Sequence, residues 1–488
     1  MYRLSEVTDN NILKDIPFKT RHSNWKYASN GSFQLVGSIL SATQSMYLYF
    51  YYFNVLGLNN VLILIALIIF SIYDAVNDPL IGYLVDRNFK WTKKFGRRFP
   101  WIVIGIGPWC LSLYLIFSAP AVDASVNPLP VFFWLLISLF IFDTFGSMIG
   151  INVMALRPDL FREESERQKL TYYWTFFDMI AVAVGMLVPP LFLGAGNNRA
   201  SFALMGGMIS VIALVCAIMF LPGAHEDKIV IDRYYSGDYK RMNFFGGIKQ
   251  VLKQKSFIVF FIALNVFAMT TSILMTMGPY VNNFLLRGAP GDEVIIYAIF
   301  ILGTIISVPF WLKYLKKIEN NKKVISVGGL FLGISLIPLT FFVTAIDLYI
   351  FFFIVGIAMG SMWSCFYTII QASVVDDFVA TTKKNQKGVL LGVSVLLGRL
   401  VATVDEGIIT LVQIITGFPA GVADFASLEA AIISTGGNLG LALLGIRLLV
   451  GIIPAIILIL GTLIWWKYFP LTQEKILQNK KILEEIGF

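Results

Sequence analysis

The sequence predicts an all-α membrane protein, because its residues are too apolar to cover a water-facing surface. Hydrophobic residues make up 57% of the 488 residues and charged residues only 14%, whereas an ordinary globular domain has about 45–50% apolar and about 25% charged residues. The mean hydropathy is +0.75. Apolar residues form twelve long runs rather than the short alternating segments of a β-barrel. These observations exclude a soluble domain, a disordered chain and a disulfide scaffold.

Each apolar run is long enough to cross a bilayer, which takes about 17–25 residues in a helix. A spanning segment must satisfy its backbone hydrogen bonds internally, so each run is expected to be helical. The first thirty residues are polar and mixed in charge, and no cleavable signal peptide is expected there. In chain order the predicted spans are 33–56, 61–85, 101–120, 130–156, 171–195, 200–222, 256–286, 294–312, 324–345, 349–375, 388–417 and 439–466.

The basic residues predict the orientation of these spans. With both termini in the cytoplasm, the inner segments hold 34 of the 38 Lys and Arg residues. The outer loops hold Arg199 and Arg287, and the spans hold Arg399 and Arg447. Because basic residues concentrate on the cytoplasmic side of membrane proteins, this distribution predicts that both termini are cytoplasmic. It also accounts for the net charge of +8 without a nucleic-acid partner.

The longest inner loop divides the spans into two sets of six, a layout typical of transporters built from two repeats. Apolar and basic residues alternate in this loop and in the tail, which favours solvated amphipathic connectors over helices lying at the membrane interface. The predicted parts are a cytoplasmic segment (1–32), an N-terminal six-helix bundle (33–222), a central cytoplasmic linker (223–255), a C-terminal six-helix bundle (256–469) and a cytoplasmic tail (470–488).

Several kinds of chemistry have no support in the sequence. Cys110, Cys216 and Cys365 lie in apolar runs, which indicates packing rather than disulfide bonds. His22 and His225 lie in polar segments, so a zinc site or a Ser–His pair inside the membrane is not expected. Zinc-protease, nucleotide-binding and nucleophile-elbow motifs are all missing. We therefore expect no enzyme, no cofactor, and no metal other than a coupling Na⁺.

Ionisable residues inside the spans mark candidate functional sites, because each costs roughly 2.5–3.5 kcal/mol to insert. Asp74 and Asp78 lie four residues apart in the second span, so their carboxylates share one helix face. With Asn77 beside them, they offer oxygen ligands that hold Na⁺ or share a proton. An interhelical ion pair is the structural alternative.

Arg399 in the eleventh span is expected near mid-membrane, at a depth similar to that of Asp74. An arginine there requires an acidic partner or a water-filled cavity. We expect Arg399 to alternate between compensating the second-span carboxylates and releasing them to a cation. For the other charged residues of the spans, structural pairing and cavity lining stay equally open: Asp143, Asp178, Asp405, Glu406 and Arg447.

One ordered segment carries a family resemblance: Asp74-Ala-Val-Asn-Asp78-Pro-Leu-Ile-Gly82-Tyr-Leu-Val-Asp86-Arg87, followed by Gly96-Arg97-Arg98-Phe-Pro100-Trp101. It resembles the second helix and the following loop of the glycoside–pentoside–hexuronide:cation symporters, of which bacterial melibiose permease is the best-known type. The second half also resembles the general loop of the major facilitator superfamily. Gly82 is expected to permit close helix packing. The expected cytoplasmic gate consists of Gly82, Asp86, Arg87, Gly96, Arg97 and Arg98.

This resemblance implies a major facilitator fold with two six-helix bundles, and secondary active symport by alternating access. The family's cation site combines two aspartates, an intervening asparagine and a fourth-helix hydroxyl, which fall at Asp74, Asp78, Asn77 and Ser147. A lysine of the family's eleventh helix falls at Arg399. The segment Val374-Val-Asp376-Asp377-Phe378 particularly resembles the lysophospholipid-transporting branch.

The departures from the family concern the substrate. Its sugar-binding acids fall at Ser38 and Gly150, a helix 5 arginine falls near Thr175, and a helix 4 tryptophan falls at Met154. The sugar-clamping residues are therefore missing while the cation half is kept. A cavity aromatic can stack on a ring-shaped substrate, although belt or packing roles are commoner. The candidate cavity residues are Ser38, Gly150, Thr175, Asp178 and Trp363.

The leading expectation is symport of a sugar or glycoside driven by Na⁺ or H⁺ across the cell membrane, on family precedent alone. A first alternative keeps the mechanism and moves an amphiphile such as a lysophospholipid. A membrane sensor is less favoured, because the longest loop has only about 33 residues. An intramembrane enzyme is least favoured, because no nucleophile–base pair is recognisable. No obligate protein partner is expected besides the lipid bilayer.

Overall fold

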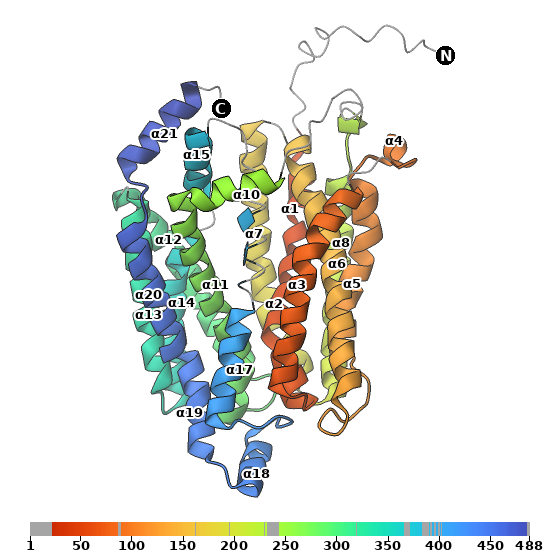
Figure 1. Ribbon diagram of the computed structural model, residues 1–488, viewed down its shortest axis with the longest axis vertical. Helices are drawn as coiled ribbons and strands as arrows, with labels where there is room; N and C mark the ends of the chain where they lie inside the picture. The colour runs from red at the N-terminus through yellow and green to blue at the C-terminus, as the bar shows by residue number, and fades with distance from the viewer. Residues whose placement is uncertain are drawn as a thin grey trace.

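The computed structural model describes residues 22–85, 89–161, 163–194, 196–228, 230–231, 244–318, 320–365, 371–382 and 403–485, with a few positions between 390 and 401. All regular elements of this described chain are helices. Figure 1 shows a bundle with four helices gathered at one end and α18 (Phe425–Thr435) at the other. The four are α4 (Thr92–Phe95), α10 (Phe244–Lys253), α15 (Gln371–Thr382) and α21 (Gln473–Glu485). These are called the α10 end and the α18 end.

The N-terminal helices pack mainly on one another. Helix α2 lies against α7 and α8, α5 lies against α6 and α8, and α3 lies against α6. The set consists of α1 (Asn24–Gly31), α2 (Phe33–Phe50), η1 (Tyr51–Val55), α3 (Asn60–Val85), α5 (Phe99–Phe117), α6 (Pro128–Leu160), α7 (Glu164–Leu187), η2 (Pro189–Phe192) and α8 (Arg199–Ala224).

The C-terminal helices form a second set. Helix α12 lies against α14, and α13 lies against both α14 and α20. The set consists of α11 (Lys255–Tyr280), η3 (Val281–Leu286), α12 (Glu293–Ile318), α13 (Asn321–Leu336), η4 (Ile337–Thr340), α14 (Ala345–Cys365), α17 (Val404–Thr416), α19 (Leu439–Val450) and α20 (Ile452–Tyr468).

Ten helices of the described chain are long and apolar enough to cross a membrane, so the protein is a multi-pass membrane protein. The predicted span 33–56 folds as α2 and η1, but its serine, glutamine and tyrosine residues make it less apolar than the ten. Much of the predicted span 388–417 lies outside the described residues. The last span differs from its predicted form, because Gly451 separates α19 from α20 where its backbone approaches Thr340. Twelve spans remain a prediction.

Prolines inside the helices leave backbone carbonyls without their usual partners. Pro279 in α11 removes the amide that would bond the carbonyl of Met275. The Tyr297 hydroxyl donates to this carbonyl instead, at 3.0 Å. A side chain at position 278 would prevent this contact, since a Cβ on Gly278 would lie 1.6 Å from the Tyr297 hydroxyl oxygen. The glycine, proline and tyrosine thus act as one packing unit.

Helices α2 and α11 end in the same unusual way. Each continues into a π-helical turn, η1 after α2 and η3 after α11. A residue with left-handed backbone follows in each case, Gly57 at φ 75° and Arg287 at φ 55°. The two ends touch, because the Tyr280 hydroxyl donates to the side-chain oxygen of Asn54. The end of one set of helices is therefore bonded to the equivalent end of the other.

The two sets of helices are joined toward the α18 end. Described side-chain hydrogen bonds cross between them from Tyr47 to Glu293 (2.8 Å), from Tyr49 to Gln413 (2.9 Å) and from Asn54 to the Val422 carbonyl (2.7 Å). At the α10 end the described side-chain hydrogen bonds stay within one set, such as those of Asp377 with Ser256 and Asn479. The structure is therefore locked at one end of the bundle.

Candidate functional site

Helix α3 carries the predicted cation ligands in its second half. Asp74 is 2% exposed, Asn77 is buried and Asp78 is partly buried. The Asn77 side-chain amide donates to Oδ2 of Asp143 on α6, at 2.9 Å. One turn earlier, the hydroxyls of Tyr73 and Thr144 are 2.6 Å apart. These bonds fix α3 against α6 and bring Asp143 into the carboxylate group, a role that the sequence left open.

Several oxygens near this contact are available to a ligand. Ser147 lies one turn beyond Asp143 on α6, and its buried hydroxyl makes no hydrogen bond. The buried Oδ1 of Asp78 likewise makes none. Pro79 cannot donate to the carbonyl of Ala75, which is therefore left as a further acceptor. Carboxylate, hydroxyl and carbonyl oxygens are the ligands that hard cations prefer.

The predicted cavity residue Asp178 contacts the predicted position Ser38. The Ser38 hydroxyl donates to Oδ1 of Asp178 at 2.6 Å, and the Gln34 amide donates to the same oxygen at 3.0 Å. A carboxylate from α7 therefore reaches the place on α2 where the resemblance expects an acid. The sequence did not predict this pairing, because the two residues lie 140 positions apart.

The other candidate cavity residues differ in their surroundings. Thr175 is exposed on α7. A Cβ added to Gly150 would meet no atom within 4 Å, so open space adjoins α6 there. Trp363 is partly buried and packs against the hydrophobic core. The described contacts thus assign packing to Trp363 and leave its expected stacking on a substrate as a prediction.

The loop before α5 docks on the segment that follows α8. The Arg98 backbone amide donates to Oε1 of Glu226 at 3.0 Å. Gly96 adopts a φ of 90°, and a Cβ there would lie 1.4 Å from Oε2 of Glu226. A glycine is therefore required at position 96 by both backbone and space. Burial raises the pKa of the Glu226 carboxyl, and the Arg98 amide acts in the opposite direction.

The rest of the expected gate is less closely packed. A Cβ at Gly82 would meet nothing within 4 Å, so the close packing expected there is not present in this conformation. Arg97 belongs to the loop before α5, and its side chain is partly buried. Asp86, Arg87 and the proposed coupling residue Arg399 lie outside the described residues.

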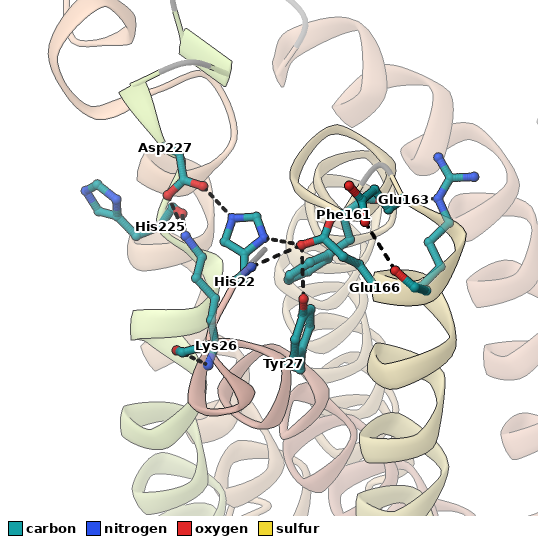
Figure 2. Close-up of polar contacts among 11 residues, drawn as sticks. His22, Lys26, Tyr27, Phe161, Glu163, Glu166, His225 and Asp227 are labelled. Carbon is teal, nitrogen blue, oxygen red and sulfur yellow. Dashed lines mark hydrogen bonds and ion pairs between the residues drawn. The ribbon is translucent and has the colours of Figure 1, made fainter. Parts of the chain in front are cut away.

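A polar cluster around His22 ties three segments together at the α10 end (Figure 2). The His22 ring lies 2.8 Å from Oε1 of Glu166 through Nδ1 and 2.7 Å from Oδ2 of Asp227 through Nε2. Lys26 pairs with the other Asp227 oxygen at 2.6 Å, and the Tyr27 hydroxyl donates to Glu166 at 3.0 Å. The bond to Asp227 raises the pKa of His22, and the bond from His22 lowers the pKa of Asp227 to about 2.

Arg157 is a buried cation that the sequence analysis counted as part of an inner loop. It is 7% exposed near the end of α6. Its Nε donates to Asn30 at 3.1 Å, and its guanidinium carbon lies 3.9 Å from the ring centroid of Trp174. Neither Nη1 nor Nη2 has a hydrogen bond, and no described carboxylate forms an ion pair with Arg157. Such a fork is suited to a bidentate anion.

Two further questions from the sequence have structural answers. Arg447 donates to the carbonyls of Phe342 at 2.8 Å and Thr340 at 3.2 Å, so it serves the backbone rather than a described carboxylate. Cys110 and Cys216 are free thiols, as predicted. The side chain of Cys365 lies outside the described part of the chain.

A multi-pass bundle of two helix sets that are joined at one end, with carboxylates between the helices, is an arrangement that membrane transporters use. Solved structures share this fold. A variant of the nucleoside transporter NupG matches with a TM-score of 0.58 and 13% identity over 91% of this chain and 99% of that chain. The xylose transporter XylE from E. coli, in an inward open conformation, matches with a TM-score of 0.54 and 12% identity over 93% and 98%.

The family described as MFS/sugar transport protein matches residues 29–473, and the chain belongs to it. The expected major facilitator superfamily is thereby confirmed. A sodium-dependent lysophosphatidylcholine symporter 1-B from Danio rerio is 25% identical over 94% of this chain and 88% of its own length. A sodium-dependent lysophosphatidylcholine symporter 1 from Xenopus tropicalis is 23% identical over 86% of this chain and 82% of its own length. A sphingosine-1-phosphate transporter from the same species is 22% identical over 85% of this chain and 81% of its own length. These relatives are not melibiose-permease-like sugar symporters, so they favour the amphiphile alternative over the sugar expectation.

Proposed function

We propose that the chain is a cell-membrane symporter that uses Na⁺ to drive transport of a lysophospholipid-type amphiphile. The relatives named above support both the ion and the cargo. The observation that carries the proposal is the hydrogen bond from Asn77 to Asp143, which assembles a carboxylate-rich contact between α3 and α6. We further propose twelve spans, two six-helix halves and cytoplasmic termini.

The proposed cation site lies along this contact. Na⁺ is held by the carboxylates of Asp74 and Asp78 with oxygens of Asn77 and Ser147, and Asp143 orients the Asn77 amide. Since carboxylates inside a membrane are costly as isolated anions, binding of a cation stabilises the site in the state that has access to it. Arg399 keeps its proposed part as the positive charge that replaces Na⁺ after release.

The proposed amphiphile site uses the positions where sugar-binding acids are absent. Ser38 and Gly150 carry no carboxylate themselves, and the Asp178 oxygen beside Ser38 already accepts from Ser38 and Gln34. Open space adjoins Gly150. The unpaired Nη1 and Nη2 atoms of Arg157 suit the phosphate of a lysophospholipid, because a planar guanidinium binds phosphate through two parallel hydrogen bonds. Trp174 holds the guanidinium plane in place.

The side of the membrane to which the site opens follows from the proposed cytoplasmic location of the termini. With the α10 end in the cytoplasm, the hydrogen bonds that join the two sets of helices lie on the outer side. The structure then corresponds to an inward-facing state of an alternating-access cycle. Release of Na⁺ and cargo to the cytoplasm precedes the breaking of these outer contacts.

Transport in proteoliposomes tests the proposal. The purified protein should accumulate labelled lysophosphatidylcholine when Na⁺ is present outside, and Asp78→Asn should abolish this uptake. Asp123→Asn, in an exposed loop, is the matched control and should transport normally. Lysophospholipid should also raise the apparent melting temperature in Na⁺, because a ligand that binds only the folded state stabilises it. Undiminished Na⁺-driven uptake by Asp78→Asn would refute the cation assignment, and saturable glycoside uptake would refute the cargo.

A further inference from the structure

Helix α17 places two adjacent carboxylates inside the bundle, away from the α3–α6 contact. Asp405 is 4% exposed, and Glu406 is partly buried beside it. Oδ1 of Asp405 and Oε2 of Glu406 are both shielded from solvent and have no hydrogen-bond partner. Neither residue forms an ion pair with a Lys, Arg or His of the described chain. Two neighbouring unsatisfied acids in a spanning segment are costly unless a ligand compensates them.

Neutral oxygens surround these carboxylates. The Ser272 side chain on α11 lies next to the Asp405 carboxyl. Thr410 lies one turn after Glu406, so both face the same side of α17. The Thr410 hydroxyl is 3.1 Å from the hydroxyl of Tyr49 on α2. The site therefore lies at a contact between the two sets of helices and is rich in hydroxyl oxygens.

The site is separate from the carboxylates of α3. A Cβ on Gly407, next to Glu406, would lie 3.9 Å from Leu64 on α3. Asp74 follows ten residues after Leu64 in the same helix, a distance of about 15 Å along the axis. One cation therefore cannot satisfy both pairs of carboxylates.

The ligand chemistry indicates a monovalent cation. Ca²⁺ takes 6–8 oxygen ligands and is usually bound by several carboxylates, whereas the described chain has no group of three or more His, Cys, Asp or Glu residues arranged to hold a metal ion. Hydroxyl and carboxylate oxygens are ligands for hard cations. A proton would neutralise one acid but would have no use for the neutral hydroxyls of Ser272 and Thr410.

We propose that Asp405 and Glu406 form a second Na⁺ site, with Ser272 and Thr410 as neutral ligands. This inference rests on the proposed cation-coupled function and extends it to two cations for each transport cycle. One cation binds to the N-terminal helices and the other to the C-terminal helices. Because Thr410 contacts Tyr49, occupancy of the second site is linked to the contacts that join the two sets of helices.

Equilibrium binding of ²²Na⁺ to the purified full-length protein tests the proposal without requiring transport. The wild-type protein should bind two Na⁺ ions. The double variant Asp405→Asn with Glu406→Gln should bind one, and so should Asp78→Asn. Combining all three substitutions should remove binding. Glu429→Gln, an exposed acid on α18, is the charge-matched control and should leave two ions bound.

The variants are designed to keep the fold, because amides match the size of the acids and remove charges that are costly to bury without a partner. Gel filtration and thermal unfolding check this directly. Ser272→Ala keeps both acids and should weaken binding of the second Na⁺ by about tenfold, the change expected for losing roughly 1.4 kcal/mol of interaction.

The outcomes separate this inference from the proposed function. Wild-type protein that binds one Na⁺, with no change in the Asp405 and Glu406 double variant, would overturn the second site while leaving Na⁺-driven uptake intact. Binding of two ions without any Na⁺ dependence of lysophospholipid uptake would instead refute the proposed function and leave the second site standing. If Asp405 and Glu406 exchange a proton and bind no second Na⁺, the assignment of Na⁺ to this site would be overturned.

Discussion

The Asn77 amide and the Asp143 carboxylate meet at 2.9 Å across the interface of α3 and α6. This bond orients the Asn77 side chain, so that its oxygen faces away from Asp143. Asn77 lies between Asp74 and Asp78 in the sequence. Asp143, which holds Asn77 in place, is therefore a positioning residue for the proposed cation site rather than an isolated buried acid.

Replacement of Asp143 by Asn should weaken Na⁺ binding by about ten- to a hundredfold, because a hydrogen bond to a charged group contributes roughly 1.5–3 kcal/mol. The half-saturating Na⁺ concentration for uptake measures the effect. Lysophospholipid affinity at saturating Na⁺ should be unchanged if Asp143 acts through Asn77. An equal loss of uptake at all Na⁺ concentrations would indicate that Asp143 has a purely structural role.

Replacement of Tyr49 by Phe should favour opening at the α18 end. The Tyr49 hydroxyl donates to Gln413 at 2.9 Å and lies 3.1 Å from the Thr410 hydroxyl. Loss of a hydrogen bond costs about 1 kcal/mol, which shifts the equilibrium between the closed and open α18 end about fivefold. Spin labels at Val126 and Ile433, both exposed, should report a larger long-distance population. Tyr468→Phe, at an exposed tyrosine, should leave the distance distribution unchanged.

The His22 cluster predicts a pH dependence of stability. The bond to Asp227 raises the pKa of His22 in the folded protein, so its stabilising contribution is complete below about pH 6.5 and is lost as pH rises through the folded value. Thermal unfolding should show the wild-type protein losing stability over that range. His22→Gln should be less stable at pH 6 and should lack this slope. His225→Gln should retain the slope, because the His225 side chain is exposed and its contact with Lys26 is through the backbone carbonyl, which the substitution keeps.

Two glycines of the expected gate should respond in opposite directions to alanine. Gly96→Ala places a Cβ against Glu226 at a φ of 90°, and strained backbone of this kind costs of order 1–3 kcal/mol. Gly82→Ala adds a methyl in open space within a helix and should stabilise by about 0.5–1 kcal/mol. Melting temperatures in detergent compare the two. Equal effects would contradict the docking of the loop on Glu226.

Removal of the Arg157 guanidinium should impair cargo binding selectively. Arg157→Gln should raise the half-saturating lysophosphatidylcholine concentration by about tenfold, equivalent to about 1.4 kcal/mol. Arg157→Lys should show an intermediate effect, since an ammonium provides charge without the bidentate fork. Na⁺ binding should not change in either variant. Lys323→Gln, at an exposed lysine, controls for loss of one positive charge.

The membrane class and most helices were predictable because apolar length alone identifies a spanning helix. The place of Asp74 and Asp78 inside a spanning helix was also predictable, since charge within such a run stands out, and their part in cation binding stays a prediction. The partners of these groups were not. Asp143 bonds to Asn77 across 66 positions, and His22 bonds to Asp227 across 205. A single sequence contains no record of which distant residues meet.

Arg157 shows a different limit of sequence analysis. Near the end of a span, a basic residue looks like the other cytoplasmic charges, and its burial depends on how α1, α6 and α7 pack. The neighbouring Pro158 pointed the other way, because a proline usually predicts that a helix ends or kinks, yet α6 extends to Leu160. The break at Gly451 was missed because both sides of it are apolar.

The matching ends of α2 and α11 have a consequence for the ancestry of the protein. A π-helical turn is in effect a one-residue insertion in an α-helix and is rare. Tyr51-x-x-Asn54 begins at the first residue of η1, and Tyr280-x-x-Asn283 begins one residue before η3. The same pattern thus stands within one residue of the same place, although the halves otherwise share little sequence. Two independent insertions at the same point are improbable. One insertion that preceded duplication of a half-length gene accounts for both, and its position gives the register in which the two halves of the sequence should be aligned.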